Sequence, residues 1–170
     1  MKLETVLKGL IGVLTAALIF VVYDSIRERN VVVGDTAPSF KLTADSGKQF
    51  TRSDFGGKVL VLNFWATWCP PCIEEMPSLN AFSKQMAGTG VVVLGVSVDQ
   101  NDQQYKAFLK RNNLSFETSR DPEANTPAEY GTYKYPETYV IDASGKVRQK
   151  HIGAVDWSDP AVVASIKGLL

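Results

Sequence analysis

The sequence predicts a three-layer α/β/α domain over residues 31–170, preceded by an N-terminal transmembrane segment and linker over residues 1–30. Two apolar runs, VLVLNFW at 59–65 and VVVLGVSV at 91–98, are rich in β-branched residues and are typical of central parallel strands covered on both faces. A helical pattern between them completes a strand–helix–strand crossover. With 45% apolar residues and no internal repeat, the chain is expected to form one globular domain.

The apolar N-terminal segment predicts the compartment of this domain. Residues 9–23 carry no charge, and an extension back to Thr5 with Lys8 at the interface gives a helix of about 28 Å, close to the hydrocarbon thickness of about 30 Å. Because Lys2 and Lys8 precede the apolar run, we expect a single span of the cytoplasmic membrane with the C-terminal domain on the periplasmic, extracytoplasmic side. A cleaved signal peptide is the alternative, but no Ala-x-Ala pattern follows Phe20, which favours an uncleaved signal-anchor.

The remaining elements follow from local patterns. Spacings of three and four put one buried stripe on the first helix of the domain, made of Cys72, Glu75, Met76, Leu79, Phe82 and Met86. Asp159 and Pro160 supply the N-cap and first position of the last helix, whose inward side is expected to hold Val162, Val163, Ile166, Leu169 and Leu170. The other elements expected are a hairpin at 40–42 and 49–51, helices at 70–87 and 102–112, and strands at 138–141 and 146–152.

Composition argues against several function classes. The 18 basic and 18 acidic side chains give zero net charge, whereas a nucleic-acid-binding surface needs a basic excess. One His and two Cys cannot fill a four-ligand zinc site without carboxylates. We therefore expect no nucleic acid, no metal and no cofactor, and the two cysteines become the candidate site.

Both cysteines lie in the segment Trp68-Cys69-Pro70-Pro71-Cys72, at the junction of a strand and a helix. A sulfur there faces unpaired backbone N–H groups and the positive end of the helix dipole, and both favour the thiolate. Pro70 and Pro71 suit the first helical positions but remove donors, so the sulfur should depend on the Cys72 N–H. The spacing holds the sulfurs close enough to form a disulfide, so the pair can attack a partner disulfide and resolve the mixed disulfide internally.

Three other roles compete with redox exchange. A structural disulfide would close a very short loop, which restricts the unfolded chain little. Half of a metal site would need His151, which lies far along the sequence. Inert buried thiols are hard to reconcile with an exported domain and an exposed helix start. Position and spacing together favour a redox-active pair.

The residues around the cysteines resemble a known family. The segment 63–72, NFWATWCPPC, looks like the active-site segment of thioredoxin-fold proteins, and 34–40, GDTAPSF, is similar to the start of the TlpA/ResA-like branch. That branch comprises membrane-anchored extracytoplasmic thiol–disulfide oxidoreductases related to the AhpC/TSA redoxins. The resemblance covers about residues 31–170. It implies a thioredoxin-like domain with an N-terminal β-hairpin extension.

The resemblance also implies roles for individual residues. Cys69 would attack, Cys72 would be buried and would resolve, and Tyr135-Pro136 would be a cis-proline loop that faces the cysteines and pairs with an extended substrate segment. The sequence by itself leaves an ordinary trans turn open at Pro136. Trp68 would shield the sulfur or contact a partner, although plain packing is equally consistent with its position.

Two polar residues stand close to the pair. Asn63 lies in an apolar strand where thioredoxins typically carry a buried Asp, and an amide cannot accept the proton of the resolving thiol at ordinary pH. Glu75 lies one turn beyond Cys72 on the buried stripe, where a desolvated carboxylate would have a raised pKa and could exchange protons with that thiol. The branch carries a Glu at this position that is implicated in redox chemistry and partner selection. The alternative is a solvated helix-start carboxylate, as expected of Glu74.

The function expected from these residues is that of a membrane-tethered protein-disulfide reductase. The resemblance implies exported protein disulfides as substrates, with apocytochrome c in cytochrome c maturation as an example, and a membrane electron donor of the CcdA/DsbD type. An oxidant or isomerase of exported proteins would use the same residues at a higher potential. A thiol peroxidase is disfavoured because Leu62 occupies the position of the expected proline, and a Sco-type copper chaperone because its two cysteines lie one residue further apart.

Overall fold

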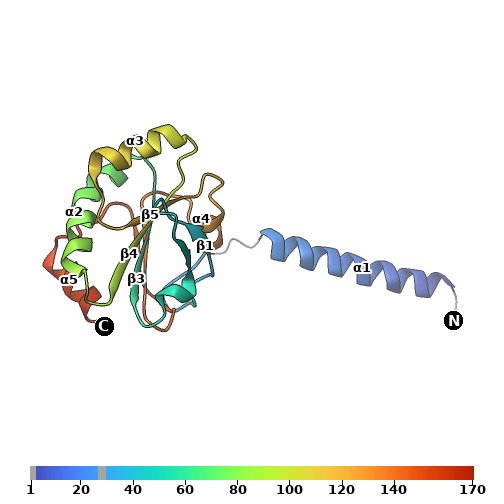
Figure 1. Ribbon diagram of the computed structural model, residues 1–170. Coiled ribbons are helices and arrows are strands. Elements are labelled where there is room, and N and C mark those ends of the chain that lie inside the picture. Colours follow the sequence, from blue (N-terminus) through green and yellow to red (C-terminus); the bar gives the residue numbers. More distant parts are fainter. Residues whose placement is uncertain (1–2, 27–29) are drawn as a thin grey trace.

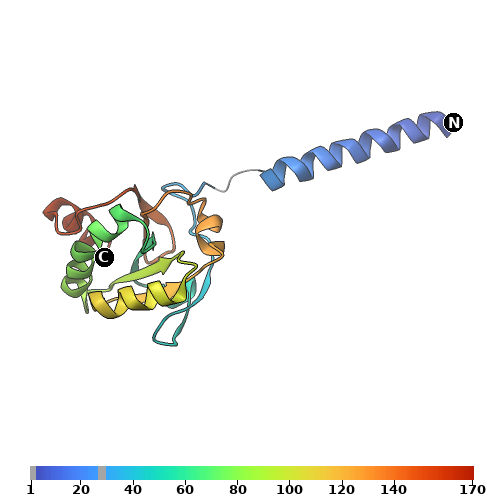
Figure 2. The same cartoon turned by 90° about the horizontal axis from the view of Figure 1, so that it is seen from above.

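The computed structural model describes residues 3–26 and 30–170. Helix α1 (Leu3–Ile26) lies outside the α/β domain in both views of the chain (Figure 1, Figure 2). Its segment Leu3–Val22 has a mean hydropathy of 2.3 and is long and apolar enough to cross a membrane, as a signal sequence also can be. Lys2 and residues 27–29 lie outside the described residues. Of the linker expected at residues 25–30, residues 25–26 instead continue α1.

A five-stranded mixed sheet forms the centre of the domain. Its strands lie in the order β5-β4-β3-β6-β7; β4 is parallel to β3 and β5, and β6 is antiparallel to β3 and β7. The predicted hairpin is present as an antiparallel pair of β1 and β2. The strands are β1 (Lys41–Thr43), β2 (Gln49–Thr51), β3 (Val59–Trp65), β4 (Val91–Ser97), β5 (Glu117–Arg120), β6 (Glu137–Ile141) and β7 (Val147–Ile152).

Each face of the sheet has its own covering layer, because successive side chains of a strand point to opposite faces. Apolar residues at odd-numbered positions of β3 pack with α2, α3 and α5, whereas those at even-numbered positions pack with the hairpin, η1 and α4. Figure 1 shows α2 and α5 on the side of the sheet away from α4 and β1. The helices of the domain are η1 (Arg52–Phe55), α2 (Pro70–Met86), α3 (Asp102–Asn112), α4 (Asn125–Tyr130) and α5 (Pro160–Lys167).

The sequence patterns do not predict β5, α4 or the short helix η1, and the first two of these show why. β5 is polar, and its buried hydroxyls bind the rest of the fold: Thr118 donates to the Asp45 carboxylate and Ser119 to the Thr43 carbonyl. α4 has six residues, and the Asp121 carboxylate outside the helix accepts the backbone N–H groups of its first two residues. Both elements depend on tertiary or non-adjacent partners, so hydrophobic periodicity does not reveal them.

The stripe predicted on α2 is confirmed, and that of the last helix is confirmed in part. All six stripe residues of α2 are buried. On α5, Ile166 is buried and Val162 and Val163 are half-buried. The prediction for Leu170 is wrong, because α5 ends at Lys167 and the chain leaves the helical stripe before Leu170, which is 62% exposed.

Candidate active site

The disulfide of Cys69 and Cys72 lies where β3 passes into α2. Cys69 is the N-cap of α2 and Cys72 lies in its first turn, with 5.3 Å between their Cα atoms. Cys69 Sγ accepts a hydrogen bond of 3.3 Å from the Cys72 N–H, which is the expected donor because Pro70 and Pro71 carry no N–H. Cys69 retains an exposed fraction of 5%, and Cys72 is fully buried. An incoming partner would therefore reach Cys69 before Cys72.

Trp68 and the loop at Tyr135–Pro136 meet beside this disulfide. Trp68 directly precedes Cys69, is 60% exposed, and meets the Tyr135 ring edge-on with 6.0 Å between centroids. The Tyr135–Pro136 peptide bond is cis, and Tyr135 packs against the core cluster that contains both cysteines. Within residues 3–26 and 30–170, the Tyr135 N–H and C=O make no hydrogen bond, so both remain open to an extended peptide segment.

Glu75 is a buried carboxylate on the inner side of α2, with only 3% of the residue exposed. Its Oε1 accepts a hydrogen bond from Asn63 Nδ2 at 2.8 Å. Its Oε2 accepts from the Val155 N–H at 3.0 Å and from Trp157 Nε1 at 3.4 Å. Burial raises the pKa of Glu75 above its usual value, and the three hydrogen bonds oppose that shift only in part. The solvated alternative is therefore wrong for Glu75, whereas Glu74 is exposed.

Asn63 connects β3 to this carboxylate. It is fully buried, and its Nδ2 also lies 2.9 Å from Thr138 Oγ1. In the described part of the chain, its Oδ1 has no hydrogen-bond partner. If the amide turned over, Oδ1 would face Glu75 and could accept the proton of a neutral carboxyl. The two orientations of Asn63 thus match the two protonation states of Glu75.

Two buried carboxylates to which sequence patterns assign no role hold the loops of this site. Asp99 accepts hydrogen bonds from the N–H and the hydroxyl of Thr67, at 2.9 and 2.6 Å, and so fixes the turn before Trp68 and Cys69. The sequence feature that could have indicated Asp99 is its position just after a strand that runs parallel to β3, at the carboxyl end of that strand. Glu137 directly follows the cis-proline and pairs with Lys150 Nζ at 2.8 Å. No local pattern indicates this pair, because the Lys lies on the neighbouring strand β7.

His151 does not join the cysteines in a ligand cluster. Over residues 3–26 and 30–170, no group of three or more His, Cys, Asp or Glu side chains could hold a metal ion. The His151 ring instead packs edge-on against Trp157, with 5.8 Å between centroids, and shares a hydrogen bond of 3.1 Å with Gln149.

Comparison with known proteins decides the family. The AhpC/TSA family model matches residues 33–150, which is most of the α/β domain. The chain belongs to the AhpC/TSA family. This AhpC/TSA-family chain is 34% identical to thiol-disulfide oxidoreductase ResA from Bacillus cereus over 140 residues, which cover 81% of each protein. It is 37% identical to the thiol:disulfide interchange protein DsbE from Vibrio cholerae over 136 residues, which cover 78% of this chain and 72% of DsbE.

A solved structure extends the comparison to the fold. The crystal structure of a thiol:disulfide interchange protein of the thioredoxin family from Chlorobium tepidum matches with a TM-score of 0.70 and 30% identity. The match covers 81% of this AhpC/TSA-family chain and 99% of that protein. The thioredoxin-like fold and the resemblance to ResA-like proteins are thereby confirmed.

The AhpC/TSA-family chain is a thiol–disulfide oxidoreductase of the ResA and DsbE type, and it carries the close cysteine pair that this chemistry requires. Its apolar helix α1, together with these relatives, indicates a membrane-anchored extracytoplasmic protein. Protein thiols and disulfides are the substrate class of such an enzyme.

Proposed function

We propose that the chain is a single-pass protein of the cytoplasmic membrane that reduces disulfides of exported proteins. In this proposal, residues 1–30 are an uncleaved anchor and linker with a cytoplasmic N-terminus, and residues 31–170 are the redox domain on the periplasmic side. The observation that carries the proposal is the Cys69–Cys72 disulfide at the start of α2, in which Cys69 keeps an exposed fraction of 5% and Cys72 is fully buried.

The reaction proceeds in two balanced exchange steps. The Cys69 thiolate attacks one sulfur of the substrate disulfide, forms a mixed disulfide and releases the first substrate thiolate. The Cys72 thiol then gives its proton to the Glu75 carboxylate, attacks Cys69 Sγ and releases the second substrate thiolate. Two electrons have passed to the substrate, whose thiolates take up protons from water, and Glu75 returns its proton to water. The product is the Cys69–Cys72 disulfide seen here.

The neighbouring residues support these steps. The exposed Trp68 indole offers apolar contact beside Cys69, and the free backbone of Tyr135 before Pro136 can pair with an extended substrate. Asn63 holds Glu75 by a direct hydrogen bond. Pro70 and Pro71 start α2 without competing N–H groups, so that the donor at Cys69 Sγ is the Cys72 N–H.

The direction of electron flow and the partners are part of the same proposal. The similarity to ResA and DsbE supports a reducing role, with apocytochrome c as the proposed substrate. A domain tethered outside the membrane cannot exchange with cytoplasmic reductants by diffusion. Its disulfide must therefore be reduced through a membrane protein, and a donor of the CcdA/DsbD type would meet that need.

A single-turnover assay tests the proposal. The reduced full chain in detergent micelles, freed of reductant, should reduce the disulfide of an oxidised Cys-x-x-Cys-His peptide, the motif that attaches haem in c-type cytochromes. Because the two exchange steps balance, each peptide disulfide lost should yield one Cys69–Cys72 disulfide. Cys69→Ser should bring the rate down to that of the peptide alone. No reduction by the wild-type chain, or an equal rate with Cys69→Ser, would contradict the proposal.

A further inference from the structure

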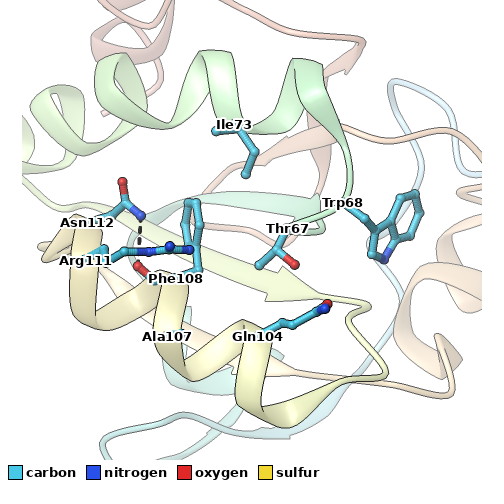
Figure 3. Close-up of a pocket in the computed structure, with 8 residues that line it drawn as sticks. All are labelled: Thr67, Trp68, Ile73, Gln104, Ala107, Phe108, Arg111 and Asn112. Carbon is cyan, nitrogen blue, oxygen red and sulfur yellow. Dashed lines mark hydrogen bonds between the residues drawn. The ribbon is translucent and has the colours of Figure 1, made fainter.

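We propose that the groove between the start of α2 and helix α3 binds the substrate segment that flanks the reacting cysteine, and selects an apolar residue and, further from that cysteine, a carboxylate. This inference rests on the proposed function and deepens it by naming the substrate sequence. The α2–α3 groove, with Trp68 at one end and Arg111 at the other, has a volume of about 750 Å³ and lies directly beside the active-site turn (Figure 3). That size is in the usual range for ligand sites.

The floor of the α2–α3 groove is apolar. Phe108 of α3 is buried and Ile73 of α2 is half-buried, and both line the groove between its two ends. Trp68, which is 60% exposed, forms the wall next to Cys69. A segment that leaves Cys69 along this path would cover the indole, and an apolar side chain there would remove the exposed surfaces of Trp68 and Ile73 from water.

The charge at the far end of the groove has no carboxylate partner among residues 3–26 and 30–170. Arg111 is exposed, and no carboxylate in the described ranges pairs with it. Lys106 and Arg120, by contrast, both pair with Asp102. A guanidinium accepts a carboxylate in a bidentate geometry, so Arg111 is complementary to an acidic side chain of the substrate.

The geometry of α3 sets the spacing of the selected residues. Gln104 borders the groove with Trp68, and Arg111 follows seven positions later on the same helix, which is about 10 Å along the axis. An extended peptide advances about 3.3 Å per residue and covers that distance in about three residues. The step from Cys69 to Trp68 adds about one more residue. We therefore expect the carboxylate about four residues from the reacting cysteine of the substrate.

Matched peptides test this selection on the reduced full chain in detergent micelles. Each peptide carries one cysteine as a mixed disulfide with thionitrobenzoate, flanked by Leu on both sides. One peptide has Asp at the fourth position on each side, a second has Lys there, and a third ends at the leucines. Release of thionitrobenzoate measures the attack by Cys69, and every rate is divided by that of the short peptide. We expect the acidic peptide to react about three- to tenfold faster than the basic one.

Two charge variants locate the source of this preference. Arg111→Glu should reverse it, whereas Lys110→Glu should retain it, because Lys110 lies in the same last turn of α3 but does not line the groove. Both variants alter the net charge and the helix end equally. An equal change in both variants, or equal wild-type rates for the two long peptides, would overturn the groove but leave the proposed function intact. Failure of all three peptides to react with wild-type protein would contradict the proposed function and the groove with it.

Discussion

Replacing Cys72 by Ser is expected to convert the enzyme into a trap that holds its substrates as mixed disulfides on Cys69. Cys72 is fully buried directly behind Cys69, and without its thiol the mixed disulfide has no internal route to resolution. Turnover should fall to background. Membranes from cells that express the full-length variant should show, on non-reducing gels, adducts that disappear when a reductant is added.

The matched control is Cys69→Ser. This variant keeps one thiol, but that thiol belongs to the fully buried Cys72, so a partner disulfide cannot reach it and no adduct should form. Adducts of equal yield with both variants would contradict the order of attack and resolution. The absence of adducts with Cys72→Ser would contradict the exchange mechanism.

Replacing Glu75 by Gln is expected to slow the resolving step by about 10²-fold at neutral pH and to change its pH profile. A positioned general base contributes a factor of this order, and Gln cannot accept the proton of Cys72. In the wild type, the single-turnover rate should rise with pH as the raised pKa of Glu75 is passed, and then level off. The variant should lack this inflection. Stopped-flow reduction of a peptide disulfide across the pH range measures both curves.

The same substitution should change the pH dependence of stability. Below pH 4.5, which is the usual pKa of a Glu side chain, Glu75 is protonated in both the folded and the unfolded chain. Its pKa shift then adds no pH dependence to the free energy of unfolding. As pH rises, the unfolded chain releases this proton first because burial raises the folded-state pKa, so the folded state loses stability until that pKa is passed. The free energy of unfolding of Glu75→Gln minus that of wild type should therefore grow as pH rises above 4.5.

Glu74→Gln is the matched control for both measurements. Glu74 is the exposed neighbour of Glu75 on α2, and its substitution should leave the pH profile and the stability difference unchanged. The fold should tolerate Gln at position 75. The side-chain amide of Asn63 can turn over, so that its Oδ1 accepts a hydrogen bond from the amide NH₂ of the new Gln. Identical profiles for the wild type and Glu75→Gln would refute a proton role for Glu75.

The sequence predicts those parts of the fold that local patterns determine. The apolar runs of β3 and β4, the stripe on α2 and the Asp159 cap of α5 each depend on residues a few positions apart, and each is present in the structure. β5 is not predicted, because its polar strand is stabilised by side chains of the distant hairpin, such as Asp45.

The candidate site likewise has some features that follow from local sequence patterns and others that only the folded structure shows. The position of the cysteines at a helix start and the burial of Glu75 follow from spacing along α2. Two of the three donors that hold Glu75 do not, since Val155 and Trp157 come from the loop before α5, about 80 positions away. The lack of a carboxylate partner for Arg111 among the described residues also requires the structure, because only the fold shows that the nearby Asp102 pairs with Lys106 and Arg120.

The equilibrium reduction potential of the Cys69–Cys72 pair tests the central claim most directly. The full chain in detergent micelles would be equilibrated with defined ratios of reduced and oxidised dithiothreitol or glutathione, quenched by alkylation, and assayed for the free thiols of the two cysteines. A reductant of exported disulfides should show a potential at or below about −220 mV. A potential near about −120 mV would contradict the proposed direction of electron flow and would make the protein an oxidant.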